Sequence, residues 1–180
     1  MATQQILEIE TQVKVVQPGE GRVGGLAPGV GVIFKIAGAD SGGRLSVVEH
    51  PFEVGALVPP HVHTLEDEIS IVLEGEIGYR SNDQEVVLGP GGYIVKPRNE
   101  VHAMWNAGKT RARMIELIAP AGFEGFFGEL SDMTAAGPFD LGAAAQIAQR
   151  YGLQFAQPDW LPSVIARYGL IPPPHPPVRV

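Results

Sequence analysis

Short strand-forming segments follow one another along this chain, separated by gaps the length of a turn. They lie at residues 30–37, 45–49, 69–73, 76–80, 85–88, 93–96, 102–106 and 113–118. The 23 glycines and 16 prolines among 180 residues favour turns between short strands over long helices. This spacing predicts a mainly β fold, either an antiparallel sandwich or a barrel.

Helical patterns replace the strand-forming segments after Pro120. Three helices are predicted, at residues 123–130, 141–151 and 160–168. Asp140 and Asp159 precede the last two helices at N-cap positions. Both of these helices end in Arg-Tyr-Gly-Leu, in which Gly152 or Gly169 can adopt the left-handed conformation of a C-cap. We therefore expect a helical appendage that follows the β structure.

The start of the chain predicts one more strand, because apolar and polar side chains alternate over residues 7–15. Residues 19–24 match the G-x-G-x-x-G pattern of a dinucleotide site. A strand-forming segment follows instead of the required helix, so we interpret them as a flexible loop. The expected division is a barrel with its N-terminal strand at 1–120, helices at 121–170 and an extended or disordered proline-rich tail at 171–180.

Composition and charge exclude several classes of protein. The 13 basic and 20 acidic side chains give a net charge of −7, and the basic residues form no cluster, so no nucleic-acid partner is expected. The lack of cysteine excludes disulfides, thiolate metal ligands and cysteine nucleophiles. Without a signal-peptide pattern, or a stretch near the roughly 18 apolar residues of a membrane-spanning helix, we expect a cytoplasmic protein that does not bind membranes.

The residues suited to chemistry lie in two segments. His61 and His63 are one residue apart, so on a strand both imidazoles point to the same side. Glu68 begins the next predicted strand and can turn its carboxylate toward the same point, and His102 comes from the second segment. Three imidazoles and one carboxylate suit one divalent transition-metal ion, Fe, Mn, Co, Ni or Zn, and leave up to two coordination positions open.

These two segments resemble the paired motifs of the cupins, a superfamily of small barrels. The first motif, G-x5-H-x-H-x4-E-x6-G, is matched by Gly55, His61, His63, Glu68 and Gly75. The second, G-x5-P-x-G-x2-H-x3-N, is matched by Gly91, Pro97, His102 and Asn106, with Asn99 where the family has glycine. Asparagine tolerates the left-handed backbone that such a turn requires. The resemblance covers residues 30–118 and implies a cupin-type double-stranded β-helix (jelly-roll) barrel with C-terminal α-helices outside it. It also implies that the metal ligands are His61, His63, Glu68 and His102.

Other titratable residues near the motifs are given structural interpretations. A lone histidine usually packs in a core or lies on the surface, and we assign His50 and His175 to these cases. Glu66 and Asp67 fall in the turn before the strand of Glu68, so we treat both as solvated.

Alternation along the two strands selects candidates for a substrate pocket. Ser70 and Val72 share a face with Glu68, and Met104 shares a face with His102. A further group of pocket candidates is the apolar segment with Phe123, Phe126 and Phe127. These aromatic residues either line or cover the barrel mouth and exclude water, or belong to a helix that packs on the outer sheet.

Two features predict a homodimer. The alternating residues 7–15 form a strand whose partner can lie in another subunit. Trp105 points away from the face of His102, so we expect it to pack outside the barrel or in a subunit interface. Cupins commonly pair, and closed two-fold assemblies are the commonest oligomers.

Within the cupins, the chain most resembles the quercetinase-like single-domain dioxygenases. That resemblance implies an enzyme that acts with dioxygen on a small aromatic, flavonol-like or polyketide-like substrate, with Glu68 as both metal ligand and catalytic base. Two alternatives remain open. One is a metal-dependent cyclase or isomerase that does not use oxygen, and the other is a non-catalytic barrel that binds a small ligand.

Overall fold

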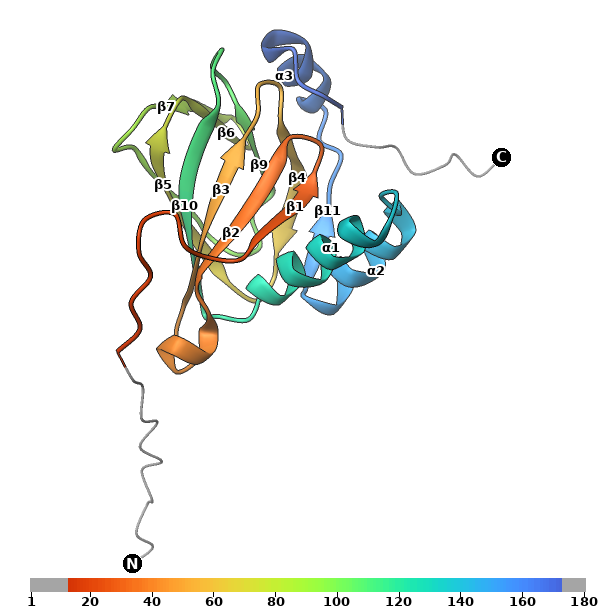
Figure 1. Cartoon of the computed structure of the whole chain (residues 1–180). Coiled ribbons are helices and arrows are strands. Elements are labelled where there is room, and N and C mark those ends of the chain that lie inside the picture. The colour runs from red at the N-terminus through yellow and green to blue at the C-terminus, as the bar shows by residue number, and fades with distance from the viewer. Residues whose placement is uncertain (1–12, 173–180) are drawn as a thin grey trace, which may run out of the picture.

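The computed structural model describes residues 13–172 and contains two antiparallel sheets that face each other in a jelly-roll barrel (Figure 1). The six-stranded sheet has the order β1 (Val23–Ala27), β2 (Val30–Ile36), β3 (Ser46–Phe52), β10 (Ala112–Ala119), β5 (Asp67–Glu74) and β8 (Tyr93–Lys96). The five-stranded sheet has the order β11 (Leu153–Phe155), β4 (Leu57–His63), β9 (His102–Asn106), β6 (Ile77–Ser81) and β7 (Gln84–Leu88). The mainly β prediction is confirmed.

Predicted and observed strands agree closely over most of the barrel. β8 and β9 have the predicted bounds, and the other predicted strands after residue 30 differ at their ends by at most three residues. The loop interpretation of residues 19–24 is wrong at its end, because β1 begins at Val23 and pairs with β2. Of the strand predicted at residues 7–15, the described part, residues 13–15, forms no strand, and the rest lies outside the described residues.

Three α-helices follow the barrel, as predicted: α1 (Glu124–Ala136), α2 (Leu141–Arg150) and α3 (Leu161–Tyr168). α1 ends six residues beyond its predicted end. A short 3-10 helix, η1 (Gly38–Ser41), connects β2 to β3. The Asp140 side chain accepts a hydrogen bond from the Ala143 N–H and caps α2, whereas the predicted cap at Asp159 is wrong because α3 starts one residue later. Gly152 (φ +69°) and Gly169 (φ +63°) adopt the predicted left-handed conformation.

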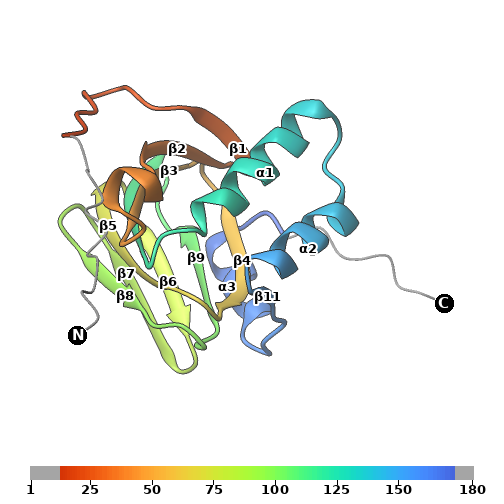
Figure 2. The ribbon, with the colours of Figure 1, turned by 90° about the horizontal axis from the view of Figure 1, so that it is seen from below.

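The first two helices lie beside the barrel and contact edge strands of both sheets (Figure 2). α1 packs on β1, α2 packs on β11, and the two helices contact each other. Because β1 and β11 are outer strands of different sheets, the helical pair spans the two sheets on one side of the barrel.

α3 covers the outer face of the five-stranded sheet around Trp105. The Trp105 side chain is fully buried and lies against Tyr168, with a ring-centroid distance of 5.2 Å. Gly78 faces the indole so closely that a Cβ there would lie 2.2 Å from it. Trp105 therefore packs outside the barrel, which is one of its two predicted positions. The residues that bury it belong to the same chain.

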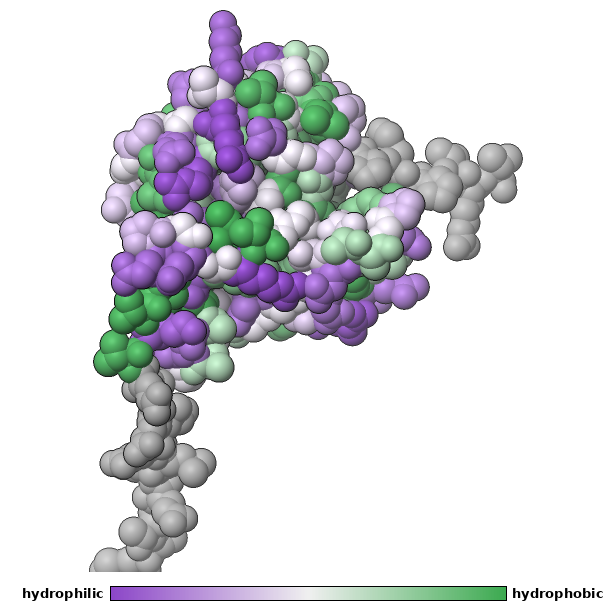
Figure 3. Space-filling model, in the orientation of Figure 1, coloured by the Kyte–Doolittle hydropathy of each residue, from purple (hydrophilic) through white to green (hydrophobic). Residues whose placement is uncertain are grey.

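The surface in Figure 3 mixes small hydrophobic areas with hydrophilic ones. Exposed large apolar side chains on the described chain include Val13, Val15 and Val23. Among the helices of residues 13–172, none is long and apolar enough to cross a membrane.

Candidate metal centre

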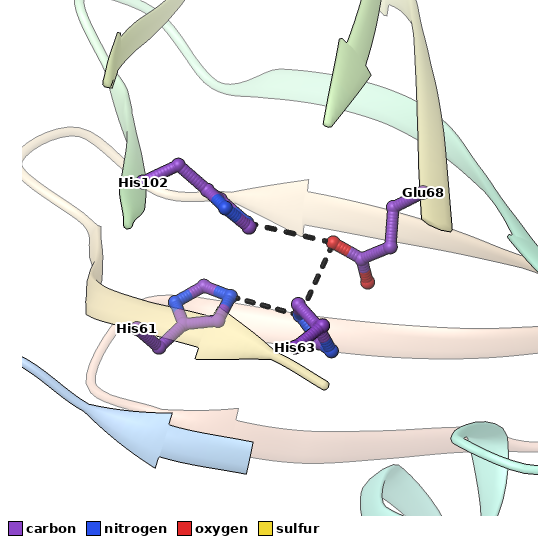
Figure 4. A group of neighbouring side chains, drawn as sticks. All are labelled: His61, His63, Glu68 and His102. Carbon is purple, nitrogen blue, oxygen red and sulfur yellow. Dashed lines mark hydrogen bonds and ion pairs between the residues drawn. The ribbon is translucent and has the colours of Figure 1, made fainter. Parts of the chain in front are cut away.

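Three strands bring the four predicted ligands together inside the barrel (Figure 4). β4 contributes His61 and His63, β5 contributes Glu68, and β9 contributes His102, which pairs with His61 across the sheet. One ligand atom of each residue lies within 4.8 Å of those of the others, and all four side chains are buried. The parity of β4 explains this convergence, because both histidines point inward.

The sequence just before His61 gives β4 an irregular register. Pro59 and Pro60 carry no N–H and cannot donate to a strand ladder. The pairing between β4 and β9 accordingly shifts between Val58 and His61. The regular ladder is interrupted directly beside the first ligand.

The turn between β8 and β9 forms a hydrogen bond with the backbone of His63. Asn99 has φ +66°, the left-handed conformation expected of the residue that replaces glycine in the motif. Its backbone N–H donates a hydrogen bond to the His63 carbonyl at 2.7 Å. This contact joins the two motif segments directly.

Each imidazole is oriented by a hydrogen bond from its Nδ1 atom. The acceptors are the Pro59 carbonyl for His61 at 2.7 Å, the Glu100 carbonyl for His102 at 3.1 Å and the Glu66 carboxylate for His63. Carbonyls and carboxylates only accept, so Nδ1 carries the proton in each ring. When the rings are neutral, the three Nε2 atoms therefore carry lone pairs, which is the form that binds a metal.

The free Nε2 atoms fit a divalent cation. The Nε2 atoms of His61 and His63 lie 3.0 Å apart, and the buried Nε2 of His102 has no hydrogen-bond partner among the described residues. Glu68 Oε2 lies 3.3 Å from the His63 Nε2 and 3.7 Å from the His102 Nε2. Converging lone pairs repel unless a positive charge lies between them, so this buried set is suited to one metal ion.

The interpretation of Glu66 as a solvated residue is wrong. Its side chain is only 3% exposed and accepts the Nδ1 proton of His63. Asp67 instead lies at the surface and forms an ion pair with Arg98 at 2.9 Å. A carboxylate that receives the second N–H of a ligand histidine is a frequent feature of metal sites, and the three-residue spacing from His63 was the available signal.

Charges around the centre shift the pKa values of the ligands in opposite directions. Burial lowers the pKa of His61 well below its usual value, and the neighbouring histidines add to this effect. Burial acts in the same sense on His63, but Glu68 and Glu66 outweigh it and raise its pKa to about 9. Without a metal, the most favourable position for a proton in this set is therefore His63.

Lys96 is a buried cation beside the centre that the sequence interpretation missed. Its Nζ lies 2.8 Å from Glu68 Oε2 and 2.7 Å from Glu116 Oε2, and Glu116 also accepts a hydrogen bond from Ser70. Lys96 and Glu68 are direct partners in the pairing of β5 with β8. Burial opposes ionisation of Glu68, but Lys96 and His63 outweigh it and lower the pKa of Glu68. The alternation of β8 was a signal for an inward lysine.

A cavity of about 830 Å³ opens beside the centre, and its walls are mainly apolar. The ligands His61, His63 and Glu68 line it, as do Lys96 and Glu116. The remaining wall comes mostly from α1, α2, β11, α3 and the segments between them. The helical appendage therefore builds much of the cavity wall.

The predicted pocket residues differ in their positions. Met104, Phe123, Phe126 and Phe127 line the cavity, and the Phe123 ring packs against the His63 ring with centroids 4.4 Å apart. Val72 is packed in the hydrophobic core, and Ser70 lies behind the wall with its hydroxyl on Glu116. His50, interpreted as structural, also lines the cavity.

Comparison with known proteins identifies a cupin domain at residues 49–118. The chain is 37% identical over 76 residues to germin-like protein subfamily T member 2 of Arabidopsis thaliana, a match that covers 39% of this chain. It is 30% identical over 90 residues to quercetin 2,3-dioxygenase of Bacillus subtilis (strain 168), which covers 50% of this chain. These matches span only 34% and 26% of the two relatives' own lengths.

Solved structures show the same fold. KdgF from Halomonas sp. superposes with a TM-score of 0.57 and 21% identity, covering 63% of this chain and 99% of that protein. The polyketide cyclase RemF from Streptomyces resistomycificus superposes with a TM-score of 0.53 and 25% identity, covering 60% of this chain and 80% of RemF.

Proposed function

We propose that this chain, whose residues 49–118 match the cupin domain, is a metal-dependent enzyme that catalyses dioxygenation of a small aromatic, flavonol-like or polyketide-like substrate. The observation that carries the proposal is the convergence of three Nε2 lone pairs and one carboxylate oxygen at the wall of an apolar cavity. The similarity to quercetin 2,3-dioxygenase supports the choice of reaction.

In the proposed site, His61, His63, Glu68 and His102 hold one divalent ion. When bound, this ion supplies Lewis acidity that stabilises the anion of a substrate with adjacent oxygen atoms. The Nδ1 hydrogen bonds keep the three imidazoles in the tautomer that presents Nε2. The rings are therefore oriented before the ion binds.

The apolar wall has two proposed roles, to bind the body of the substrate and to exclude water from the reacting oxygen atoms. Phe123, Phe126 and Phe127 form one aromatic cluster, in which the Phe123 ring lies 5.0 Å from each of the other two. Met104 belongs to the same wall, and its Sδ lies 3.3 Å from the Lys96 Nζ. These side chains bring apolar surface close to the ligand set.

Proton transfer is assigned to two carboxylates that share Lys96. Glu68 is the proposed base. Its Oε2 atom, which faces the imidazoles, also forms an ion pair with the Lys96 ammonium, and this ion pair reduces the basicity of Glu68. Glu116 lines the cavity on the other side of Lys96, and burial raises its pKa although Lys96 acts in the opposite direction. Glu116 is therefore the second candidate to accept a substrate proton.

A cyclase or isomerase that does not use oxygen is the second candidate function. The similarity of fold to the polyketide cyclase RemF, at 25% identity, favours it. The same ligand set and Lys96 would stabilise an enolate in that reaction, and no co-substrate would be required. A non-catalytic ligand-binding role is the third possibility.

Oxygen consumption distinguishes the three functions. Metal-loaded protein is mixed with a panel of flavonols, diketones and hydroxylated aromatics, in air and under argon, with chelator-treated protein as the control. Dioxygenation predicts that oxygen and substrate disappear together and that argon stops the reaction. Turnover that continues under argon identifies a cyclase or isomerase. Binding of a panel member without turnover under either gas identifies a binding protein.

A further inference from the structure

His50 is a polar residue in the wall of the cavity and is not part of the candidate metal centre. It lies on β3, its side chain is only 5% exposed, and it lines the same cavity as the metal ligands. One of its two ring nitrogens is occupied, because Nδ1 lies 2.8 Å from the Gly31 carbonyl. Since a carbonyl only accepts, Nδ1 carries the proton and Nε2 is an acceptor.

The orientation of the ring is held from several sides. His50 packs edge-on against Phe127, with ring centroids 4.9 Å apart, and against Phe52 at 6.5 Å. Among residues 13–172 no hydrogen-bond partner is found for its Nε2. Burial lowers the pKa of His50 to about 4, so the ring is neutral and Nε2 keeps its lone pair near pH 7. Because the ring lines the cavity, this nitrogen is available to a hydrogen-bond donor placed there.

The strand register separates His50 from the candidate metal centre. His50 pairs with Met114 of β10, which in turn pairs with Val72 of β5. Val72 is four residues from Glu68, a distance of about 13 Å along an extended strand. Glu116, two residues from Met114 on β10, extends the polar group of Glu68, Lys96 and Glu116 along the wall toward His50. His50 is thus a further polar group in a different part of the same wall, and Met114 and Phe127 supply apolar surface beside it.

We propose that His50 accepts a hydrogen bond from a hydroxyl group of the substrate and thereby determines specificity. The cavity then takes a mainly apolar molecule with adjacent metal-binding oxygens in one part and a hydroxyl donor in another. A buried hydrogen-bonding group discriminates strongly against analogues that cannot pair with it. This inference deepens the proposed function and depends on it only for the part of the molecule that binds the metal.

Binding of flavones under argon, which prevents oxygen-dependent turnover, tests the role of His50. The probes are 3-hydroxyflavone, which has adjacent keto and hydroxyl oxygens, and its derivatives with one more hydroxyl at position 7 or 4′. We expect at least one derivative to bind metal-loaded wild-type protein about tenfold more tightly than 3-hydroxyflavone, as one added hydrogen bond permits. The advantage should disappear in His50→Phe and persist in part in His50→Gln, which keeps an acceptor.

Met114→Leu is the matched control, because Met114 pairs with His50 in the sheet and lines the same cavity without a polar acceptor. It should change the affinities of all probes by the same factor. Equal binding of the hydroxylated and parent flavones to the wild type, or binding of none, overturns the proposal, and this comparison needs no variant to fold. Selective binding without turnover in air supports the role of His50 and rejects the enzyme, whereas turnover without selectivity does the reverse.

Discussion

The Nε2 atoms of His61 and His63 lie 3.0 Å apart although both rings donate their Nδ1 protons to oxygen atoms. Two neutral imidazoles held in this way direct lone pairs at each other. A metal ion relieves the repulsion, and in its absence a proton on one ring does so. The structure therefore couples metal binding to proton release.

Metal affinity should rise with pH below about 9. The carboxylates beside His63 raise its pKa to about 9, so near pH 7 the metal-free site holds a proton that the metal must displace. The apparent affinity should increase about tenfold per pH unit between roughly pH 7 and pH 9, which corresponds to one proton released. Competition titrations with a chelator, corrected for its own protonation, measure this slope. Affinity that does not change over this range would contradict the prediction.

Replacement of Glu66 should weaken metal binding although Glu66 is not one of the four ligands. Glu66→Ala removes the acceptor that orients His63, and we expect a loss of roughly 10- to 100-fold in affinity. The control is Asp67→Asn, because the neighbouring Asp67 carboxylate pairs with Arg98 at the surface. The same competition titration applies to both variants. An equal loss in both would remove the specific role of Glu66.

Glu68→Gln separates a ligand role from a catalytic one. The amide keeps an oxygen donor but loses the charge and the basicity. Metal affinity should fall yet remain measurable, and the rate per bound metal should fall by a factor on the order of 10² or more if Glu68 acts as base. Activity and metal content are measured on the same samples, with excess metal supplied. Equal rates per metal would leave Glu68 as a ligand only.

Lys96→Met should destabilise the metal-free protein strongly, because it leaves the buried Glu68 and Glu116 without their shared cation. We expect a loss of about 3–5 kcal/mol in the free energy of unfolding. A bound metal neutralises Glu68, so the loss should be smaller in metal-loaded protein. Denaturant unfolding with and without metal measures both values, and the exposed Lys109→Met is the control. The prediction fails if metal does not reduce the difference.

The homodimer remains a prediction that now depends on fewer residues. α3 buries Trp105, so this residue offers no surface to a second subunit. The alternating residues 7–15 are the remaining basis for pairing. Light scattering at micromolar concentration should give twice the mass of one 19.2 kDa chain, and deletion of residues 1–15 should halve it. The mass of a single chain before the deletion would refute the dimer.

Local sequence patterns predicted most strands of the barrel and the positions of the candidate ligands, but they missed β1 and β11. β8 and β9 have their predicted bounds, because turn residues mark their ends and period-two alternation marks their faces. The same alternation directs His61 and His63 to one side. The left-handed Asn99, Gly152 and Gly169 were also predictable, since a positive φ depends on the residue itself and its immediate neighbours.

Tertiary structure decided what lies against each face. Alternation assigns a side chain to the inside or the outside of a strand, but the element that covers it comes from a distant part of the chain. For this reason the sequence interpretation did not predict that α3 buries Trp105, and it treated Glu66 as solvated. Lys96 meets Glu116 only because β8, β5 and β10 are neighbours in one sheet. Charges separated along the chain become partners through strand order, and a buried charge is stable only with such a partner.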